Sequence, residues 1–236
     1  MRINHNISAI NTFRQYNANT AKAGKSMEKL SSGLRINRAA DDAAGLSISE
    51  KMRGEIAGIT QKIRNTQDGI SKIQTAEGAL NEVSDMLVRM KELIIQKGNE
   101  TYGIDESGNI NLELTELGNS ISSILSGTQF NGTAVLGNVT FTTVSSTSSE
   151  GDINTGIQQI NTARAKFGAE QNRMEHEINN YSTYHENLQA AESRIRDVDM
   201  AEEMMEYTKN NILVQAAQSM LAQANQQPMG ILQLLQ

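Results

Sequence analysis

Two of the three histidines lie in the second half of the chain, and His176 is followed directly by Glu177. The zinc-protease motif His-Glu-x-x-His needs its second histidine at the fifth position, because residues four apart share one face of a helix. Asn180 occupies that position, and His185 lies nine residues after His176, on roughly the opposite face of a helix. We therefore predict no metal site and interpret both histidines as solvated surface residues.

Other residue types with catalytic potential give no stronger signal. Asp41 and Asp42 are adjacent, and adjacent side chains on a helix point in different directions, so a role at the start of a helix is favoured over acid–base chemistry. The chain has no cysteine, which excludes disulfides, thiolate zinc sites and cysteine nucleophiles. It also lacks a phosphate-binding loop, a dinucleotide glycine pattern and a nucleophile elbow. We predict a protein that is not an enzyme, with no catalytic residues and no cofactor.

Methionines are frequent near the carboxy terminus. Their positions allow either a soft-metal or promiscuous groove, or adaptable packing along a helix seam, and we favour packing. They are Met200, Met204, Met205, Met220 and Met229.

The composition of the 236 residues suits thin helical layers. Aromatic residues make up 4% of the chain and tryptophan is absent, so little area is gained per residue in a thick core. The single proline, Pro228, leaves room for very long helices. The net charge of −6 argues against nucleic acid as a partner. We find neither a secretory signal nor a membrane-spanning stretch, so export would need another route.

The strongest helix signal is a seven-residue apolar repeat between Ile48 and Lys97. A second apolar row drifts by one position, as expected when a nearly straight helix departs from a period of seven. We predict one helix, roughly 75 Å long at 1.5 Å per residue, which must lie against other helices. The first row is Met52, Ile59, Thr66, Ile73, Leu80, Leu87 and Ile94.

Shorter elements are expected after this helix. Residues 99–110 are expected to form a loop, and leucines and isoleucines three and four apart predict a helix over 112–125. The turn signal Asn131-Gly132, followed by valines among threonines, predicts a β-hairpin near 130–144. Helical character returns after the hairpin and is expected to run from 152 to 226 without interruption.

Both ends of the chain carry apolar residues at helical spacing. Residues 1–40 hold seven basic groups and one acidic group, whereas residues 190–236 hold six acidic and three basic groups. Opposite charge favours association of the two ends, although two independently solvated faces would show the same counts. We predict paired ends that bury their apolar stripes. The candidate self-assembly residues are Ile3, Ile7, Ile10, Leu30 and Leu34 at the amino end, and Ile212, Leu213, Met220, Leu221, Leu234 and Leu235 at the carboxy end.

The predicted fold is therefore mainly α. It is a long antiparallel helical coiled coil or bundle with a small β-hairpin excursion, and its N- and C-terminal helices are paired.

Two long motifs near the ends carry more information than their periodicity. The first runs Leu30-Ser31-Ser32-Gly33-Leu34-Arg35-Ile36-Asn37, then Ala39-Ala40-Asp41-Asp42-Ala43-Ala44-Gly45-Leu46, and reaches Met52-Arg53. The second runs Arg194-Ile195-Arg196-Asp197-Val198-Asp199-Met200-Ala201-Glu202-Glu203 and continues through Ile212-Leu213 to Ala224-Asn225. Together with the opening Arg2-Ile3-Asn4-His5-Asn6 and the turn Gln129-Phe130-Asn131-Gly132, they resemble the signatures of bacterial flagellin.

The resemblance implies a structural subunit that polymerises into the flagellar filament for swimming motility. Residues 1–44 and 197–236 would pair as the filament-core domain, called D0, and residues 45–196 would form the surrounding helical bundle, called D1. The chain looks like a minimal form without outer domains. The subunit would be extracellular and exported by the flagellar type III apparatus without a cleaved signal peptide.

The partners that the resemblance implies are further copies of the chain, an export chaperone on the C-terminal helix, hook-junction proteins and a filament cap. Neither nucleic acid nor a membrane is among them. A hook–filament junction protein stays open as an alternative, since it shares the terminal helices. An enzyme-bearing flagellin variant is disfavoured, because the chain has no inserted domain.

One segment, Leu87-Val88-Arg89-Met90-Lys91-Glu92-Leu93, resembles the site that the animal Toll-like receptor for flagellin recognises. Arg89 and Leu93 occupy its main contact positions, and Glu113 matches a third. The resemblance therefore implies an immune-receptor contact through these three residues.

Overall fold

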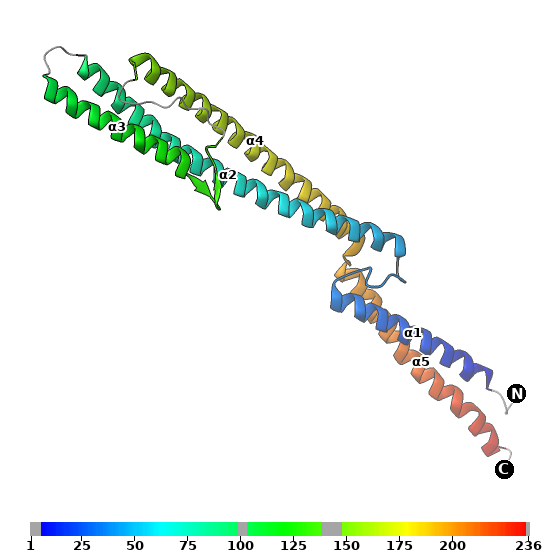
Figure 1. Cartoon of the computed structure of the whole chain (residues 1–236). Coiled ribbons are helices and arrows are strands. Elements are labelled where there is room, and N and C mark those ends of the chain that lie inside the picture. Colours follow the sequence, from blue (N-terminus) through cyan, green and yellow to red (C-terminus); the bar gives the residue numbers. More distant parts are fainter. Residues whose placement is uncertain (1–5, 99–102, 138–147, 235–236) are drawn as a thin grey trace. The chain divides into compact units, whose positions relative to one another are not determined.

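The structure is a computed structural model that describes residues 6–98, 103–137 and 148–234, with the side chains of 228–234 left out of the description. The chain divides into two compact units (Figure 1). The terminal unit comprises Met1–Ala57 and Glu186–Gln236, and the central unit comprises Gly58–His185. In the described residues, the elements are five helices and one pair of short strands: α1 (Ile7–Ser32), α2 (Ala43–Lys97), α3 (Ile104–Gly127), β1 (Gln129–Phe130), β2 (Thr133–Ala134), α4 (Glu150–Arg196) and α5 (Met200–Leu234).

Helix α2 confirms the long helix that the seven-residue repeat predicts, and it begins slightly earlier, at Ala43. Asp42 fixes this start, because its carboxylate accepts a hydrogen bond of 2.9 Å from the backbone N–H of Gly45. A side-chain acceptor at this position satisfies one of the free donors at a helix start. The expected helix-start role is therefore confirmed for Asp42, whereas Asp41 accepts from the backbone N–H of Arg38 at 3.1 Å in the turn before the helix.

The core of the central unit lies between α2, α3 and α4. The α2 stripe supplies one side, and shorter apolar rows from α3 and α4 supply the others, so that each helix buries one face. The members with no more than 2% exposure are Ala76, Leu80, Val83, Leu87, Met90 and Leu93 from α2, Leu114 and Ile121 from α3, Leu136 after β2, and Ile153 and Ile160 from α4.

Helix α3 is longer than the sequence pattern predicts. It begins at Ile104, so the expected loop over 99–110 is wrong for its second half. Asp105 and Glu106 lie in the first turn, where negative charge is favourable at the positive end of a helix. Ile110 is buried in the core, and this contact outweighs the glycine and serine residues that made the segment look like a loop.

The predicted continuous helix over 152–226 is interrupted between Arg196 and Met200. Asp197 leaves the helix to form an isolated antiparallel bridge with Leu34. Asp199 then starts α5, because its carboxylate accepts hydrogen bonds from the backbone N–H groups of Ala201 at 2.9 Å and Glu202 at 3.3 Å. The interruption depends on a partner far away in sequence, which local periodicity does not reveal.

The β-hairpin is small. Gln129 pairs with Ala134 and Phe130 pairs with Thr133 in antiparallel register. Asn131 and Gly132 form the turn with φ values of 50° and 76°, the left-handed conformation that this dipeptide adopts in two-residue hairpin loops. Part of the range predicted for the hairpin, including Val139, Phe141 and Val144, lies outside the described residues.

Candidate functional site

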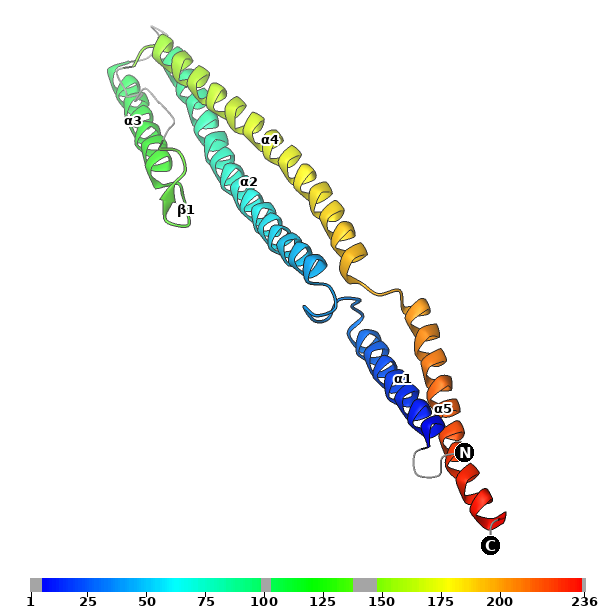
Figure 2. The same cartoon turned by 90° about the vertical axis from the view of Figure 1, so that its right-hand side faces the viewer.

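Helices α1 and α5 of the terminal unit lie side by side and run antiparallel (Figure 2). At one end of the pair, the side-chain amide of Asn6 donates to the carbonyl of Ala224 at 2.7 Å. At the other end, the ammonium of Lys29 lies 3.4 Å from the carboxylate of Glu203. The predicted pairing of the N- and C-terminal helices is confirmed.

The seam between the two helices consists mainly of small and polar side chains. Its members recur three and four residues apart, the spacing of a coiled-coil seam, and Cα atoms of α1 and α5 approach within 8 Å. Such a seam buries little apolar area, so the pair gains little stability by itself. The members are Ala9, Thr12, Tyr16, Asn19, Ala23, Ser26 and Leu30 of α1, and Glu203, Tyr207, Asn210, Val214, Ala217, Leu221 and Ala224 of α5.

Most of the large apolar side chains of the pair lie outside this seam and are exposed. We call nine of them the outward face; their exposure ranges from 41% at Leu213 to 68% at Met205. The expectation that the two ends bury their apolar stripes against each other holds only in part: Leu30 and Leu221 lie in the seam, but most of the large apolar side chains stay exposed. The outward face comprises Ile7, Ile10, Phe13 and Met27 of α1, and Met204, Met205, Ile212, Leu213 and Met220 of α5.

The candidate self-assembly residues fall into three groups. Five belong to the outward face: Ile7, Ile10, Ile212, Leu213 and Met220. Leu30, Leu34 and Leu221 are half-buried at the seam or beside it. Ile3 and Leu235 lie outside the described residues, as does the side chain of Leu234.

The seam is the feature that sequence reasoning missed. Hydropathy scales rank Asn19 and Asn210 as polar and Ala9 well below leucine or isoleucine, so a search for apolar periodicity finds the row of large apolar residues before the row of small ones. A search for small side chains with the same alternation of three and four would have found it.

A joint of short backbone contacts holds α1 beside α5. The N–H of Arg35 donates to the carbonyl of Arg196 at 2.7 Å, and the N–H of Val198 donates to the carbonyl of Gly33 at 3.1 Å. Gly33 ends α1 in the left-handed conformation with φ of 72°, which glycine adopts without the steric penalty of a side chain. These bonds fix where α1 ends relative to the start of α5.

Charged groups of the terminal unit reinforce the joint. The guanidinium of Arg196 donates to the Glu50 carboxylate at 2.6 Å, and this hydrogen bond is the main reason that the pKa of Glu50 lies below its ordinary value. Between α1 and α5 themselves, Lys29–Glu203 is the one ion pair among the described residues. The charge asymmetry of the chain ends therefore contributes little directly, since partly exposed pairs are weak.

The candidate immune-receptor residues lie in the central unit. Arg89 forms ion pairs with Glu92 at 3.2 Å and with Glu113 at 3.1 Å, and these hydrogen bonds raise the pKa of Arg89. Leu93 is only 2% exposed and belongs to the helical core. The structure thus brings Arg89 and Glu113 together at the surface, but Leu93 is not accessible to a partner.

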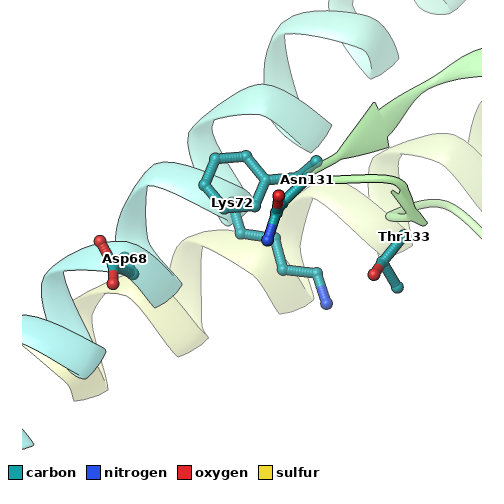
Figure 3. Close-up of a pocket in the computed structure, with 5 residues that line it drawn as sticks. Asp68, Lys72, Asn131 and Thr133 are labelled. Carbon is teal, nitrogen blue, oxygen red and sulfur yellow. The ribbon is translucent and has the colours of Figure 1, made fainter.

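A shallow pocket beside the hairpin is lined by Asp68 and Lys72 of α2 and by Phe130, Asn131 and Thr133 (Figure 3). Asp68 and Lys72 are four residues apart on α2 and carry opposite charge, a common arrangement on helix surfaces. We therefore assign the pocket no ligand. Across the described ranges, no group of three or more potential metal-binding side chains occurs. Helices long and apolar enough to cross a membrane are likewise absent from the part of the chain that the structure describes.

Family comparisons cover almost the whole chain. Residues 3–141 match the bacterial flagellin N-terminal helical region, and residues 151–235 match the bacterial flagellin C-terminal helical region. The chain is 48% identical over 271 aligned positions to a flagellin of Halalkalibacterium halodurans and 43% identical over 304 positions to a flagellin of Bacillus subtilis, with both chains covered completely in each case. A 33 kDa flagellar filament core protein of Treponema phagedenis is 40% identical, again over the full length of both chains.

The first two alignments are longer than the 236 residues of this chain, so these relatives contain residues that it lacks. The chain keeps both matched helical regions and their short connection, as expected for a minimal form. The paired ends, the long helical core and these full-length matches lead to one conclusion: the chain belongs to the bacterial flagellin family, as a structural subunit of the flagellar filament.

Proposed function

We propose that the chain polymerises by burying the outward face of α1 and α5 between neighbouring copies. The observation that carries this proposal is the exposure of the outward face: the intrachain seam is built mainly of small and polar residues and leaves nine large apolar side chains of α1 and α5 exposed. Large apolar side chains exposed in such number on a helix pair mark an interaction surface. Family membership supplies the partner, because flagellins assemble with themselves.

The size of the outward face is sufficient for this role. Full burial of one large apolar side chain is worth about 1.5–3 kcal/mol, and each of the nine is roughly half exposed, so each gains about 1 kcal/mol. The sum, on the order of 10 kcal/mol, is comparable to the cost of immobilising a subunit. Addition to a filament end, where several neighbours cover the face together, can offset this cost, whereas pairing of two free monomers covers only part of the face and does not.

The weak seam has a consequence for the free subunit. Most helical stability in proteins comes from packing of an apolar face, and this seam buries few large apolar side chains, so α1 and α5 become fully ordered when the outward face is covered. We propose accordingly that residues 1–44 and 197–236 line the filament core and that residues 45–196 form the tube around it.

Seeded elongation tests the proposal. Purified chain with filament fragments should elongate, while chain lacking roughly its first and last 30 residues should not. A double variant, Ile10→Lys with Ile212→Lys, should also fail, because it places charge on the outward face. Thr162→Lys with Thr183→Lys adds the same two charges at exposed positions of α4 and serves as the control, with normal elongation. If the intact chain does not elongate seeds, a role at the hook–filament junction replaces the polymer subunit.

We extend the proposal to the route of export and the accessory partners. The exposed methionines of α5 and Ile212 suit an export chaperone that covers the C-terminal helix before assembly. Hook-junction proteins and a filament cap bind the same terminal unit at the filament ends. Export proceeds without a cleaved signal peptide. Mass measurement of secreted subunits tests this, since an intact amino-terminal peptide is expected.

The receptor contact is proposed for Arg89 and Glu113 only. Their ion pair lies on the surface of the central unit, whereas Leu93 supports it from the core. Charge reversal Arg89→Glu should abolish receptor activation by the monomer. Arg173 forms similar pairs with Glu170 and Glu177 on α4, so Arg173→Glu is the matched control and should retain signalling. Unchanged signalling by Arg89→Glu excludes the contact.

A further inference from the structure

The methionines whose side chains the structure describes differ in exposure. Four belong to the outward face: Met27 is 55% exposed, Met204 50%, Met205 68% and Met220 57%. Met200, at the start of α5 and outside the outward face, is 48% exposed. In contrast, Met90 is completely buried in the core of the central unit, and the methionines Met52, Met86 and Met174 are half-buried. Among the described side chains, most of the exposed thioethers therefore lie on the surface assigned to assembly.

Two of these methionines line a shallow apolar depression on α5. Met204 and Met205 form it together with Ile212, and Thr208 and Lys209 complete its rim. Thioether side chains pack adaptably and are apolar, which suits an interface that must fit against several neighbours. The same side chains no longer suit an apolar interface if their sulfur becomes polar.

Oxidation produces that change. A peroxide transfers one oxygen atom to the thioether: an S–O bond forms, the O–O bond breaks, the sulfur loses two electrons, and the peroxide is reduced to water or an alcohol. The resulting sulfoxide is polar and disrupts methionine-rich interfaces. Burying it without a hydrogen-bond donor is unfavourable.

We propose that Met27, Met204, Met205 and Met220 form an oxidation-sensitive site that controls whether a free subunit can join the filament. In the monomer, the four thioethers are accessible to peroxide, and their sulfoxides oppose burial of the outward face. In the filament, neighbouring copies cover them and protect them. Methionine sulfoxide reductases restore the thioethers with electrons from thiols, so the block is reversible. This inference rests on the proposed assembly function.

The test compares hydrogen peroxide treatment of monomer and of preformed filaments at equal dose. Peptide mass mapping should find sulfoxide at the four positions in the monomer and none at Met90, which serves as the internal control. In filaments, the yield at the four positions should fall at least about fivefold, as expected for covered side chains. In the treated monomer, the critical concentration for seeded elongation should rise by roughly tenfold. Burial of one sulfoxide without a hydrogen-bond partner weakens binding by about that factor. Treatment with the two methionine sulfoxide reductases, one for each sulfoxide epimer, should restore the original critical concentration.

Two variants identify the sulfurs responsible, each compared with its own untreated sample. The Met204→Leu/Met205→Leu/Met220→Leu variant should lose most of its peroxide response. The Met52→Leu/Met86→Leu variant, which changes half-buried methionines of α2, should keep it.

The possible failures point to different conclusions. If untreated chain does not elongate seeds, the assembly function itself is wrong. If untreated chain elongates but its sulfoxide form elongates at the same critical concentration, the oxidation-sensitive site is wrong. Equal sulfoxide yields in filament and monomer also overturn it, because the four side chains then stay exposed after assembly.

Discussion

Substitution of Ile212 by alanine separates assembly from folding. Ile212 is 60% exposed on α5, so its truncation removes little that stabilises the monomer, and alanine is the better helix former. The three lost carbons represent about 2.4 kcal/mol if fully buried, at about 0.8 kcal/mol each. Assembly can bury only the share that is still exposed, which leaves about 1.4 kcal/mol and a roughly tenfold higher critical concentration.

The control is the same chemical change at a buried position. Ile160 is completely buried in the central unit, and Ile160→Ala should lower the free energy of unfolding by about 2–5 kcal/mol through the cavity that it leaves. Its outward face is intact, so its folded form should elongate seeds near the critical concentration of the unmodified chain.

The assay is sedimentation of seeded filaments at several total concentrations, with thermal unfolding of each monomer followed by circular dichroism. Ile212→Ala should change the first measurement and not the second. The reasoning is refuted if Ile212→Ala elongates at the critical concentration of the unmodified chain, or if it lowers the unfolding temperature as much as Ile160→Ala does.

Further predictions concern the joint and the ends of the terminal unit. Gly33→Ala should destabilise the unit by about 1 kcal/mol, because alanine at a left-handed φ is strained. Gly24→Ala lies inside α1 with open space around it and should stabilise the unit by about 0.5–1 kcal/mol. Thermal unfolding of the two variants compares these effects. The pKa of Glu50 is lowered in the folded chain, mainly by its hydrogen bond with Arg196. The pair therefore stabilises the joint at pH values above the ordinary Glu pKa of 4.5. This stabilisation is lost as the pH falls through the lowered pKa of the folded chain. Protection of the Arg35 amide from hydrogen exchange should accordingly drop in acid, and Glu50→Gln should remove that part of the pH dependence. Exchange in α1 and α5 should be fast in the monomer and slow in the filament, and strong protection in the monomer contradicts a weak seam.

The parts of the fold that sequence predicts well are those with a regular apolar period. The repeat from Met52 to Ile94 predicts α2, because a single stripe over that length has no other stable arrangement. The first turns of α3 have no regular apolar period, so the sequence pattern does not predict them. A single buried residue, Ile110, packs into the core and keeps these polar turns helical. The bridge between Leu34 and Asp197 joins residues far apart in sequence, so no local pattern contains it.

The candidate site shows a different limit. Ile7, Ile10 and Ile212 were selected from the sequence as self-assembly residues because they are apolar at helical spacing. Periodicity shows that such a stripe must be covered, but it does not show whether the same chain or another copy covers it. The structure distinguishes the two, since small residues such as Ala217 occupy the intrachain seam and leave the stripe free.

The most direct test of the central claim is a cryo-electron microscopy reconstruction of filaments assembled from this chain. We predict that α1 and α5 line the filament core, with Ile10 and Ile212 in van der Waals contact with residues of neighbouring copies. The claim is contradicted if these side chains face water in the filament, or if neighbouring copies contact one another only through the central unit.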